Sequence, residues 1–584
     1  MLGLKAYVVL VAIVCAGTSA TLFADDTRLP DGVRIVAESA FQRSVNQFIE
    51  AELKLYPERA TALGDHRFDT RLDDHSAVGI ARVVSQAKRW ARIFRAFDAN
   101  LLSPNSEADR EWLLANIDRE LLWTESVRSY QRDPSMYLPT AAVHELIQRN
   151  FAPAPVRMRS VTARERAALA NLRAARANLR PERVPQVAID IVLEQMPATV
   201  AFFRVSLPNA FDKVPDGPNK SAFREANARV ISAIAGYGKW LRTSLRPRAS
   251  GNYAIGADAY GRMLADEDMV DTPLDRLEQV GVIEMRQLQV QFSATARLVD
   301  PKHSPIEVAT ALGRDHPNAN QVIPSVSTGL GSIRAYVVSH HLARIPSDVA
   351  PIVAETPPYM RATTFASMDS PGPFEKTTEA YFYVTLPDPA WPREKQDQLL
   401  AFYSPPTISD TSVHEVYPGH YVQFLVNRLN RDLIRAIYDS GADVEGWALY
   451  CEQMMLDEGL HNNDPKFRLA QLQMALLRAC RYLVAIRMHT QGMTIAQATL
   501  FFEKNAYQNH HNAEVEALRG TEDPGYLRYQ LGKLMILKLR EDLRRKQGAA
   551  FSLGKFHDAF LAEGAIPVPL IRRAMLGESS GPPL

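Results

Sequence analysis

Residues 273–298 read PLDRLEQVGVIEMRQLQVQFSATARL. Apolar side chains recur in this stretch at three- and four-residue intervals, for example at Met285, Leu288 and Phe292. Such spacing places them on one face of a helix. The same spacing predicts further helices, over residues 41–63, 107–127, 162–179 and 221–245. The pattern predicts a mainly α-helical protein.

One segment departs from this helical spacing. Residues 380–386, AYFYVTL, are rich in aromatic and β-branched side chains and are stopped by Pro387, which is typical of a strand. A second candidate strand covers residues 361–366. Helical spacing resumes at Lys395 and continues to Arg545. We therefore expect a large helical body with a small β-sheet inserted before residue 400.

The composition of the chain excludes several classes of protein. The 584 residues include 67 Lys and Arg against 66 Asp and Glu, a balance that argues against a dedicated nucleic-acid binder. A hydrophobic content of 46% excludes a mainly disordered chain. Three cysteines exclude a disulfide scaffold and a four-thiolate zinc module. Cys451 and Cys480 lie in apolar helical sequence and are expected to be buried free thiols.

The first residues, 1–20, have the pattern of a secretory signal peptide. Lys5 precedes an apolar run, residues 6–16, that is too short to span a bilayer. Small residues favour cleavage after Ala20, with residue 24 as an alternative end. Val14 disfavours lipid attachment at Cys15, because that position usually holds a small residue. No later stretch resembles a membrane-spanning helix, so we expect a periplasmic or extracellular protein without stable membrane insertion.

Residues 411–423, TSVHEVYPGHYVQ, carry the clearest chemical motif. His414-Glu415 followed by another histidine is similar to the HExxH helix, in which two histidines bind zinc and the glutamate is a general base. The fourth position after His414, however, is Pro418. In an ideal helix His414 and His420 point about 120° apart around the axis, so they face different ways.

Pro418 offers a physical remedy for this mismatch. It has no N–H for the carbonyl group of His414, and its ring clashes there, so the helix must open. Gly419 tolerates the backbone angles that such an opening requires. We expect an opened turn that returns His420 to the place of the missing ligand. The alternative is an ordinary kinked helix with two hydrogen-bonded histidines.

A third metal ligand is available further along the chain. Glu445 follows His420 by twenty-five residues, in the segment EGWALYCE, and Gly446 allows close approach of another backbone. A zinc ion held by two histidines needs such a third ligand. Glu452 lies two turns further on the same face and is suited to hold a ligand histidine. The alternatives are a helix-capping role for Glu445 and a solvated position for Glu452.

Together, the motifs HExxPGH and EGWAxYxE resemble the bacterial family called domain of unknown function 885, whose members are similar to HExxH-plus-Glu (gluzincin) zinc peptidases. The resemblance extends over residues 40–575 in general pattern, with sharp motifs only in the C-terminal third. Family members often carry two consecutive histidines after Pro-Gly, but here the second is Tyr421. In an ideal helix position 421 lies ~10.5 Å along the axis from His414, which favours His420 as the ligand.

The resemblance implies a zinc metallopeptidase that acts on a peptide or small protein. Zn²⁺ would be held by His414, His420 and Glu445, with Glu415 as general base. An oxyanion donor is also needed. Tyr529 is favoured for this role because residues 523–534 resemble the family's closing helix. The other candidates are Tyr526, His489, His510 and His511.

The domain organisation follows from the same resemblance. We expect an N-terminal helical region over residues 25–350 and a catalytic region over residues 351–580, packed as one unit. The strand at 380–386 is expected to bind an extended substrate by edge pairing, or else simply to cover the core.

Two other functions are compatible with the sequence. One is a non-catalytic envelope binding or scaffold protein that retains a peptidase fold, an alternative that Tyr421 in place of histidine favours. A zinc amidohydrolase acting on a non-peptide amide is the other, since the motif specifies a reaction and not a substrate. No nucleic-acid partner is expected. The sequence leaves the oligomeric state and the choice between endo- and exo-cleavage open.

Overall fold

The structure is a computed structural model that describes residues 31–357, 360–361, 364–577 and 581–584. The expected signal peptide lies outside the described residues, as do two residues of the second candidate strand. Described helices cover all five segments in which apolar spacing predicts a helix, so the prediction of a mainly α-helical fold is confirmed.

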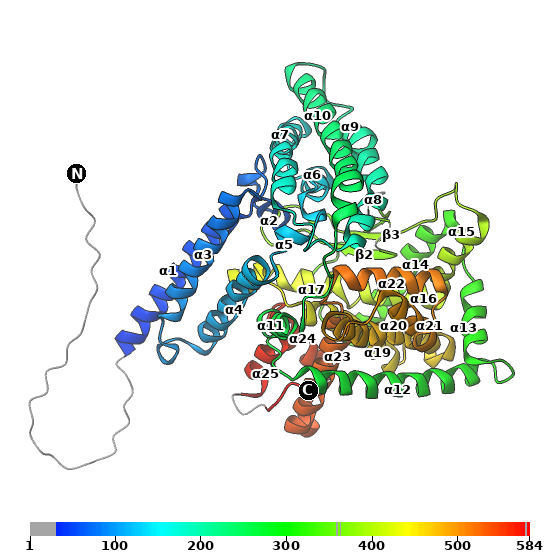
Figure 1. Cartoon of the computed structure of the whole chain (residues 1–584). Helices are drawn as coiled ribbons and strands as arrows, with labels where there is room; N and C mark the ends of the chain where they lie inside the picture. The colour runs from blue at the N-terminus through cyan, green and yellow to red at the C-terminus, as the bar shows by residue number, and fades with distance from the viewer. Residues whose placement is uncertain (1–30, 358–359, 362–363, 578–580) are drawn as a thin grey trace, which may run out of the picture.

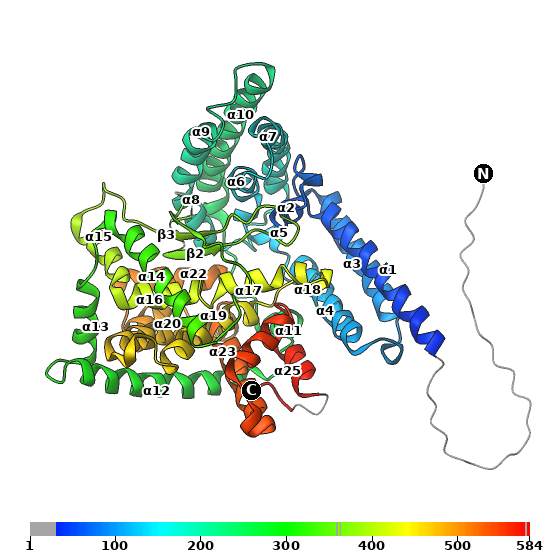
Figure 2. The same cartoon turned by 180° about the vertical axis from the view of Figure 1, so that it is seen from behind.

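The N-terminal helices form a long antiparallel arm in which α1 and α3 lie side by side (Figures 1 and 2). Its α-helices are α1 (Asp31–Leu55), α2 (Pro57–Ala62), α3 (Ala77–Arg95), α4 (Pro104–Leu121) and α5 (Ser129–Arg132). Its shorter turns are η1 (His66–Phe68), η2 (Ala99–Leu101) and the π-helical η3 (Leu122–Val127).

The next helices form a bundle at the top of Figure 1. Its elements are η4 (Ser135–Tyr137), α6 (Thr140–Gln148), α7 (Ala154–Asn178), α8 (Gln186–Ala201), η5 (Phe202–Ser206), α9 (Leu207–Asn209), α10 (Pro218–Trp240), η6 (Leu241–Leu245) and η7 (Arg246–Arg248). The bundle has its own hydrophobic core, built from residues between 137 and 249.

The remaining helices form the main body. They are α11 (Ala257–Asp268), α12 (Leu274–Val299), α13 (Pro305–Arg314), α14 (Ala319–Ser339), α15 (Arg393–Leu400), η8 (Ala401–Tyr403), α16 (Pro405–Glu415), α17 (His420–Asn427), α18 (Leu433–Ile437), α19 (Gly441–Asp457), η9 (Leu460–Asn463), α20 (Pro465–Thr490), α21 (Ile495–Asn505), α22 (His510–Glu522), α23 (Arg528–Gln547), η10 (Gly548–Ala550), α24 (Leu553–Ala562) and α25 (Val568–Leu576). One large core joins side chains of this body with those of the N-terminal arm. The division of the chain at residue 350 remains a prediction.

The small sheet has the order β1-β3-β2 (Ile352–Glu355, Tyr381–Val384 and Ala366–Asp369). β3 is parallel to β1, with Ile352 opposite Tyr381, and antiparallel to β2, with Ala366 opposite Val384. The strand expected at 380–386 is therefore confirmed, whereas the second begins where the prediction ended. Substrate binding by edge pairing on β3 is wrong, because both of its edges are already paired.

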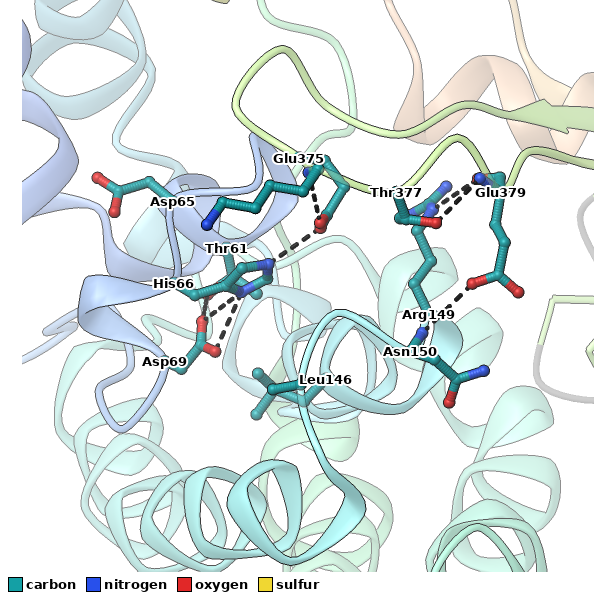
Figure 3. A network of polar contacts seen from close by, with 12 residues as sticks. Thr61, Asp65, His66, Asp69, Leu146, Arg149, Asn150, Glu375, Thr377 and Glu379 are labelled. Atoms are coloured by element: carbon teal, nitrogen blue, oxygen red, sulfur yellow. Dashed lines mark hydrogen bonds and ion pairs between the residues drawn. The ribbon is translucent and has the colours of Figure 1, made fainter.

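A polar network ties the sheet to the N-terminal helices (Figure 3). The ring of His66 in η1 contacts Asp69 through Nδ1 at 3.1 Å and Glu375 through Nε2 at 2.9 Å. Arg149 at the end of α6 pairs with Asp369 of β2 at 2.5 Å. Burial lowers the pKa of His66, but its two carboxylate partners outweigh this effect and raise it overall. These contacts fix the loop between β2 and β3.

Helix α20 forms the centre of the main body and packs against α12, α16, α21 and α23. Among the described residues, it is one of two helical stretches that are long and apolar enough to cross a membrane by length and composition; the other is Gln186–Asn209. The expectation that no stretch after the leader resembles a spanning helix therefore fails by this measure. In α20, 89% of the apolar window is buried within the protein, which accounts for its composition. Cys451 and Cys480 are buried free thiols, as expected.

Candidate metal centre

The expected opening of the helix after His414 is present. α16 ends at Glu415 and α17 begins at His420, so the motif spans two helices and not one bulged helix. The N–H of Gly419 bonds to the carbonyl oxygen of Val413, six residues back, at 3.1 Å. The indole N–H of Trp447 on α19 donates to the carbonyl oxygen of Pro418 at 2.9 Å, which holds the break in place.

The break brings the two histidines together with Glu445. The rings of His414 and His420 lie 4.8 Å apart and nearly perpendicular. The Oε2 atom of Glu445 is 3.6 Å from Nε2 of His414 and 3.4 Å from Nε2 of His420. These three residues form a group whose ligand atoms all lie within 4.8 Å of one another. Two ligands about 2.1 Å from one tetrahedral zinc ion are separated by about 3.4 Å, so the two distances from Glu445 to the histidine nitrogens are compatible with a shared metal ion.

The polar atoms of the group are consistent with a metal ligand role. Both histidines are buried, and Oε2 of Glu445 is buried without a hydrogen-bond partner among the described residues. Oε2 of Glu415 is also buried and unpartnered. Such atoms are rare in folded proteins unless they bind water, an ion or a substrate. The donor set of two imidazoles and one carboxylate matches catalytic zinc sites, which keep a fourth position open.

Glu452 holds the ring of His414 from behind. Its Oε1 atom lies 2.7 Å from Nδ1 of His414 and so directs Nε2 toward Glu445. This is the usual support for a metal-binding histidine. Glu452 is buried, which excludes the alternative interpretation of Glu452 as a solvated surface acid. Burial, and then the charge of Glu452, raise the pKa of Asp410 well above its usual range.

The carboxylates strongly affect the ionisation of the histidines. Burial lowers the pKa of His414, but Glu445 and Glu452 outweigh it and raise that pKa to about 10. Burial raises the pKa of Glu445, and the two histidines outweigh it and hold that pKa well below its usual range. In the metal-free protein His414 is therefore protonated at neutral pH. Metal binding must displace this proton, as expected for a site that exchanges protons for a metal ion.

Tyr529, the favoured candidate for the oxyanion donor, lies beside His414. Its ring stacks on that of His414, with centroids 6.2 Å apart. Its hydroxyl accepts a hydrogen bond from the guanidinium group of Arg519 at 3.3 Å. Burial, and then the charge of Glu445, raise the pKa of Tyr529 to about 12, so its hydroxyl keeps its proton at neutral pH.

Within the described part of the chain, the other four candidates form no hydrogen bond or ring contact with His414, His420 or Glu445. Nε2 of His489 bonds to the carbonyl oxygen of Gly520. His510 and His511 are exposed at the start of α22. Tyr526 is buried against Gly520: a Cβ atom built on Gly520 would lie 2.4 Å from the hydroxyl oxygen of Tyr526. Of the five candidates, Tyr529 is therefore the one whose ring contacts His414 among the residues that the structure describes.

Tyr421 does not belong to the metal group. Its hydroxyl donates to the carbonyl oxygen of Val349 at 2.6 Å, and its ring packs in the main core. The loss of a second histidine at this position thus leaves the group of His414, His420 and Glu445 complete.

Sequence reasoning missed the arginines around Tyr529. The guanidinium groups of Arg478, Arg481 and Arg519 lie 5.2–5.9 Å from the centre of the Tyr529 ring. Arg481 also forms a buried ion pair with Glu516 at 2.6 Å. A sequence signal was available, because Arg478 and Arg481 interrupt the otherwise apolar stretch of residues 474–486.

The helices that carry Glu445 and Tyr529 pack unusually closely. A Cβ atom on Gly446 of α19 would lie 2.5 Å from backbone atoms of Gly532 on α23. A Cβ atom on Gly532 would lie 1.6 Å from the carbonyl oxygen of Ala442. Only glycine permits this approach, which sets Tyr529 beside the ligands.

Comparison with known protein families shows to which family the chain belongs. The sequence profile described as "Bacterial protein of unknown function (DUF885)" matches residues 57–575, most of the chain. The chain belongs to this family. None of the curated proteins matches the chain.

Solved structures share the fold of this DUF885 protein. One, from Shewanella oneidensis, is described as a "putative lipoprotein of unknown function"; it is 25% identical with a TM-score of 0.77, over 92% of this chain and 99% of that one. Another, from Colwellia psychrerythraea and described as a "putative lipoprotein", is 18% identical with a TM-score of 0.74, over 92% of this chain and 98% of that one.

Proposed function

We propose that this protein is an exported zinc-dependent metallopeptidase. The observation that carries the proposal is the group of His414, His420 and Glu445, in which a carboxylate oxygen lies 3.6 and 3.4 Å from the two histidine nitrogens and all ligand atoms lie within 4.8 Å. Glu452 supports this role, because it orients His414 as the partners of zinc-binding histidines usually do.

Each side chain has a role in hydrolysis of an amide bond. Bound zinc supplies Lewis-acid polarisation of the scissile carbonyl group and lowers the pKa of water. Glu415, which directly follows a ligand, has a buried unpartnered oxygen that accepts the proton of the attacking water and passes it to the leaving amine. Tyr529 keeps its proton and donates a hydrogen bond to the developing oxyanion. Arg519 orients the Tyr529 hydroxyl.

Export is supported by two features. Residues 1–20 have the pattern of a signal peptide, and both solved relatives carry lipoprotein descriptions. The two free thiols of the main body are buried, so they are protected from pairing in an oxidising compartment. The proposed location is the periplasm or the cell exterior.

Metal analysis with matched variants tests the metal assignment. The purified protein should hold about one zinc ion per chain, and Glu445→Ala should remove it. Glu458→Ala is the control, because Glu458 follows the same helix and is exposed. Full zinc content in Glu445→Ala contradicts the assignment.

A digest of a peptide library tests the reaction. Cleavage should depend on zinc and should fall strongly in Glu415→Gln, while that variant keeps its metal, because Glu415 handles the proton and is not a ligand. A zinc-loaded protein that cleaves no peptide contradicts the peptidase proposal and directs the search to non-peptide amides or to a binding function.

A further inference from the structure

The balanced charge of the whole chain conceals a strongly basic part. We call residues 154–250, from α7 to η7, the basic bundle; they contain 17 Lys and Arg but only seven Asp and Glu. The rest of the chain carries the compensating acids, since the total is +1. Three of the seven acids are paired with arginines of the bundle itself, in the contacts Arg224–Asp216, Arg229–Glu225 and Arg246–Asp190. Most of the remaining cations are exposed.

The exposed cations follow a pattern along α7. Three exposed arginines recur along α7 every seven residues, an interval that returns to nearly the same side of a helix: Arg159, Arg166 and Arg173. Arg180, also exposed, follows two residues after the end of the helix. Arg176 joins this row to α10, because its guanidinium donates to the carbonyl oxygen of Gly236 at 3.3 Å. α10 also packs against α8. The cations thus extend from α7 toward the surface that α8 shares with α10.

That surface contains an apolar groove of about 490 Å³ between α8–η5 and α10–η6. Its lining includes Leu193, Pro197, Val200 and Val205, with Arg204 and Arg242 beside them. Val205 is 53% exposed. Only 33% of the apolar window in Gln186–Asn209 is buried, against 89% in the equally apolar α20. An apolar helix on the surface favours a partner that removes it from water.

We propose that the basic bundle binds peripherally to the surface of a bilayer rich in anionic phospholipid. The arginines attract headgroup phosphates, and the α8 groove receives apolar lipid atoms at the interface. Charge and apolarity occur together on this surface, which is the combination that membrane-surface helices use. A nucleic acid would use the cations but has no aliphatic group for the groove. This inference does not rest on the peptidase activity.

Vesicle co-sedimentation tests the inference, with a chain that begins at residue 25. That chain lacks Cys15 and so any lipid anchor, yet it keeps every described element. It should bind vesicles that contain phosphatidylglycerol and bind phosphatidylcholine vesicles far more weakly, and added salt should reduce the binding. Equal binding to both vesicle types, or no binding to either, overturns the proposal.

Two variants separate the contributions of charge and apolar contact. Arg204→Gln with Arg242→Gln should weaken binding roughly 25-fold, because each cation near an anionic surface contributes about fivefold. Val205→Asp should weaken it by roughly tenfold or more, because a half-exposed valine loses its burial in lipid. Arg286→Gln with Arg297→Gln, on the exposed side of α12, is the matched control and should bind as the parent does.

Circular dichroism and thermal melting establish that all variants are folded, as expected for exposed positions. Unchanged vesicle binding in the Arg204 and Arg242 variant overturns the proposal. So does a chain that binds short duplex DNA more tightly than vesicles and is insensitive to Val205→Asp, since that result assigns the cations to nucleic acid.

Discussion

The carbonyl oxygen of His414 lies where a side chain of Gly419 would stand: a Cβ atom built on Gly419 would be 1.8 Å from it. Gly419 is the fifth residue after His414, and Pro418 between them has no N–H for a helical hydrogen bond. The close approach of the two backbones brings His420 back beside His414. Two residues that cannot bind metal through their side chains thus determine the geometry of the ligands.

The variant Pro418→Ala with Gly419→Ala should lose most of its bound zinc and keep or increase its helicity. Alanine favours a regular helix over proline by ~3 kcal/mol and over glycine by ~1 kcal/mol, and a regular helix turns His420 away from His414. Metal analysis and circular dichroism measure both effects. Gly261→Ala, in α11 with no atom near the added Cβ, is the control. Retention of full zinc by the double variant would show that His420 is not a ligand.

Glu452→Gln should weaken zinc binding by about 10–100-fold without unfolding the protein. The carboxylate of Glu452 fixes the ring of His414, and loss of such a partner typically has this effect on metal affinity. Competition with a chelator measures the change, and Glu458→Gln, directly after the same helix, is the control. An unchanged zinc affinity would return Glu452 to a purely structural role.

Tyr529→Phe should lower kcat by about 10²–10³ and leave zinc content and KM nearly unchanged. The phenol donates to an oxyanion that is present only in the transition state, so its loss affects the chemical step. Tyr526→Phe is the matched control, since the buried hydroxyl of Tyr526 has no hydrogen-bond partner among the described residues. A larger loss of kcat in Tyr526→Phe than in Tyr529→Phe would show that Tyr529 is not the oxyanion donor.

Acid should destabilise the protein through His557. Its Nδ1–H donates to the carbonyl oxygen of Leu342 at 2.6 Å, and its Nε2 accepts from Tyr450 at 2.7 Å, so the ring is neutral. Burial lowers its pKa from 6.5 to about 4. The unfolded chain therefore binds more protons, and stability is present above pH 6.5 and is lost as the pH falls through 4.

Urea unfolding at several pH values measures this effect. Between pH 7 and pH 5 the contribution of His557 to the free energy of unfolding should decrease by roughly 2 kcal/mol. His557→Asn keeps a donor for Leu342 and does not titrate, so its stability should depend less on pH by about this amount. The same pH slope in both proteins would attribute acid sensitivity to other groups.

Export should remove about 20–24 residues and leave no lipid on the protein, because Val14 is a poor neighbour for lipid attachment at Cys15. Intact-mass measurement of the exported protein decides between the two outcomes. A diacylglyceryl modification on Cys15 would identify an anchored lipoprotein instead.

Local sequence patterns were sufficient for the helical class, the central strand and the motif residues. The helix at 273–298 and the strand at 380–386 depend on the spacing of neighbouring side chains, which the sequence displays directly. The central position of that strand in the sheet could not be predicted. β1 and β2, which pair with its two edges, are separated from it by turns and loops whose path depends on tertiary packing.

The sequence by itself determined which side chains are available for the metal site: two histidines around Pro-Gly and a glutamate on a later helix. Only the tertiary structure decided that His414, His420 and Glu445 meet, and that Tyr529 lies beside them. The physical reason is the distance along the sequence over which each contact acts. Periodicity reports contacts within a few residues, whereas Tyr529 is more than one hundred residues from His414 and is brought there by the close packing of α19 on α23 at Gly446 and Gly532. The excess of cations over residues 154–250 can be counted in the sequence, but the apolar groove beside them exists only once α8 and α10 pack together.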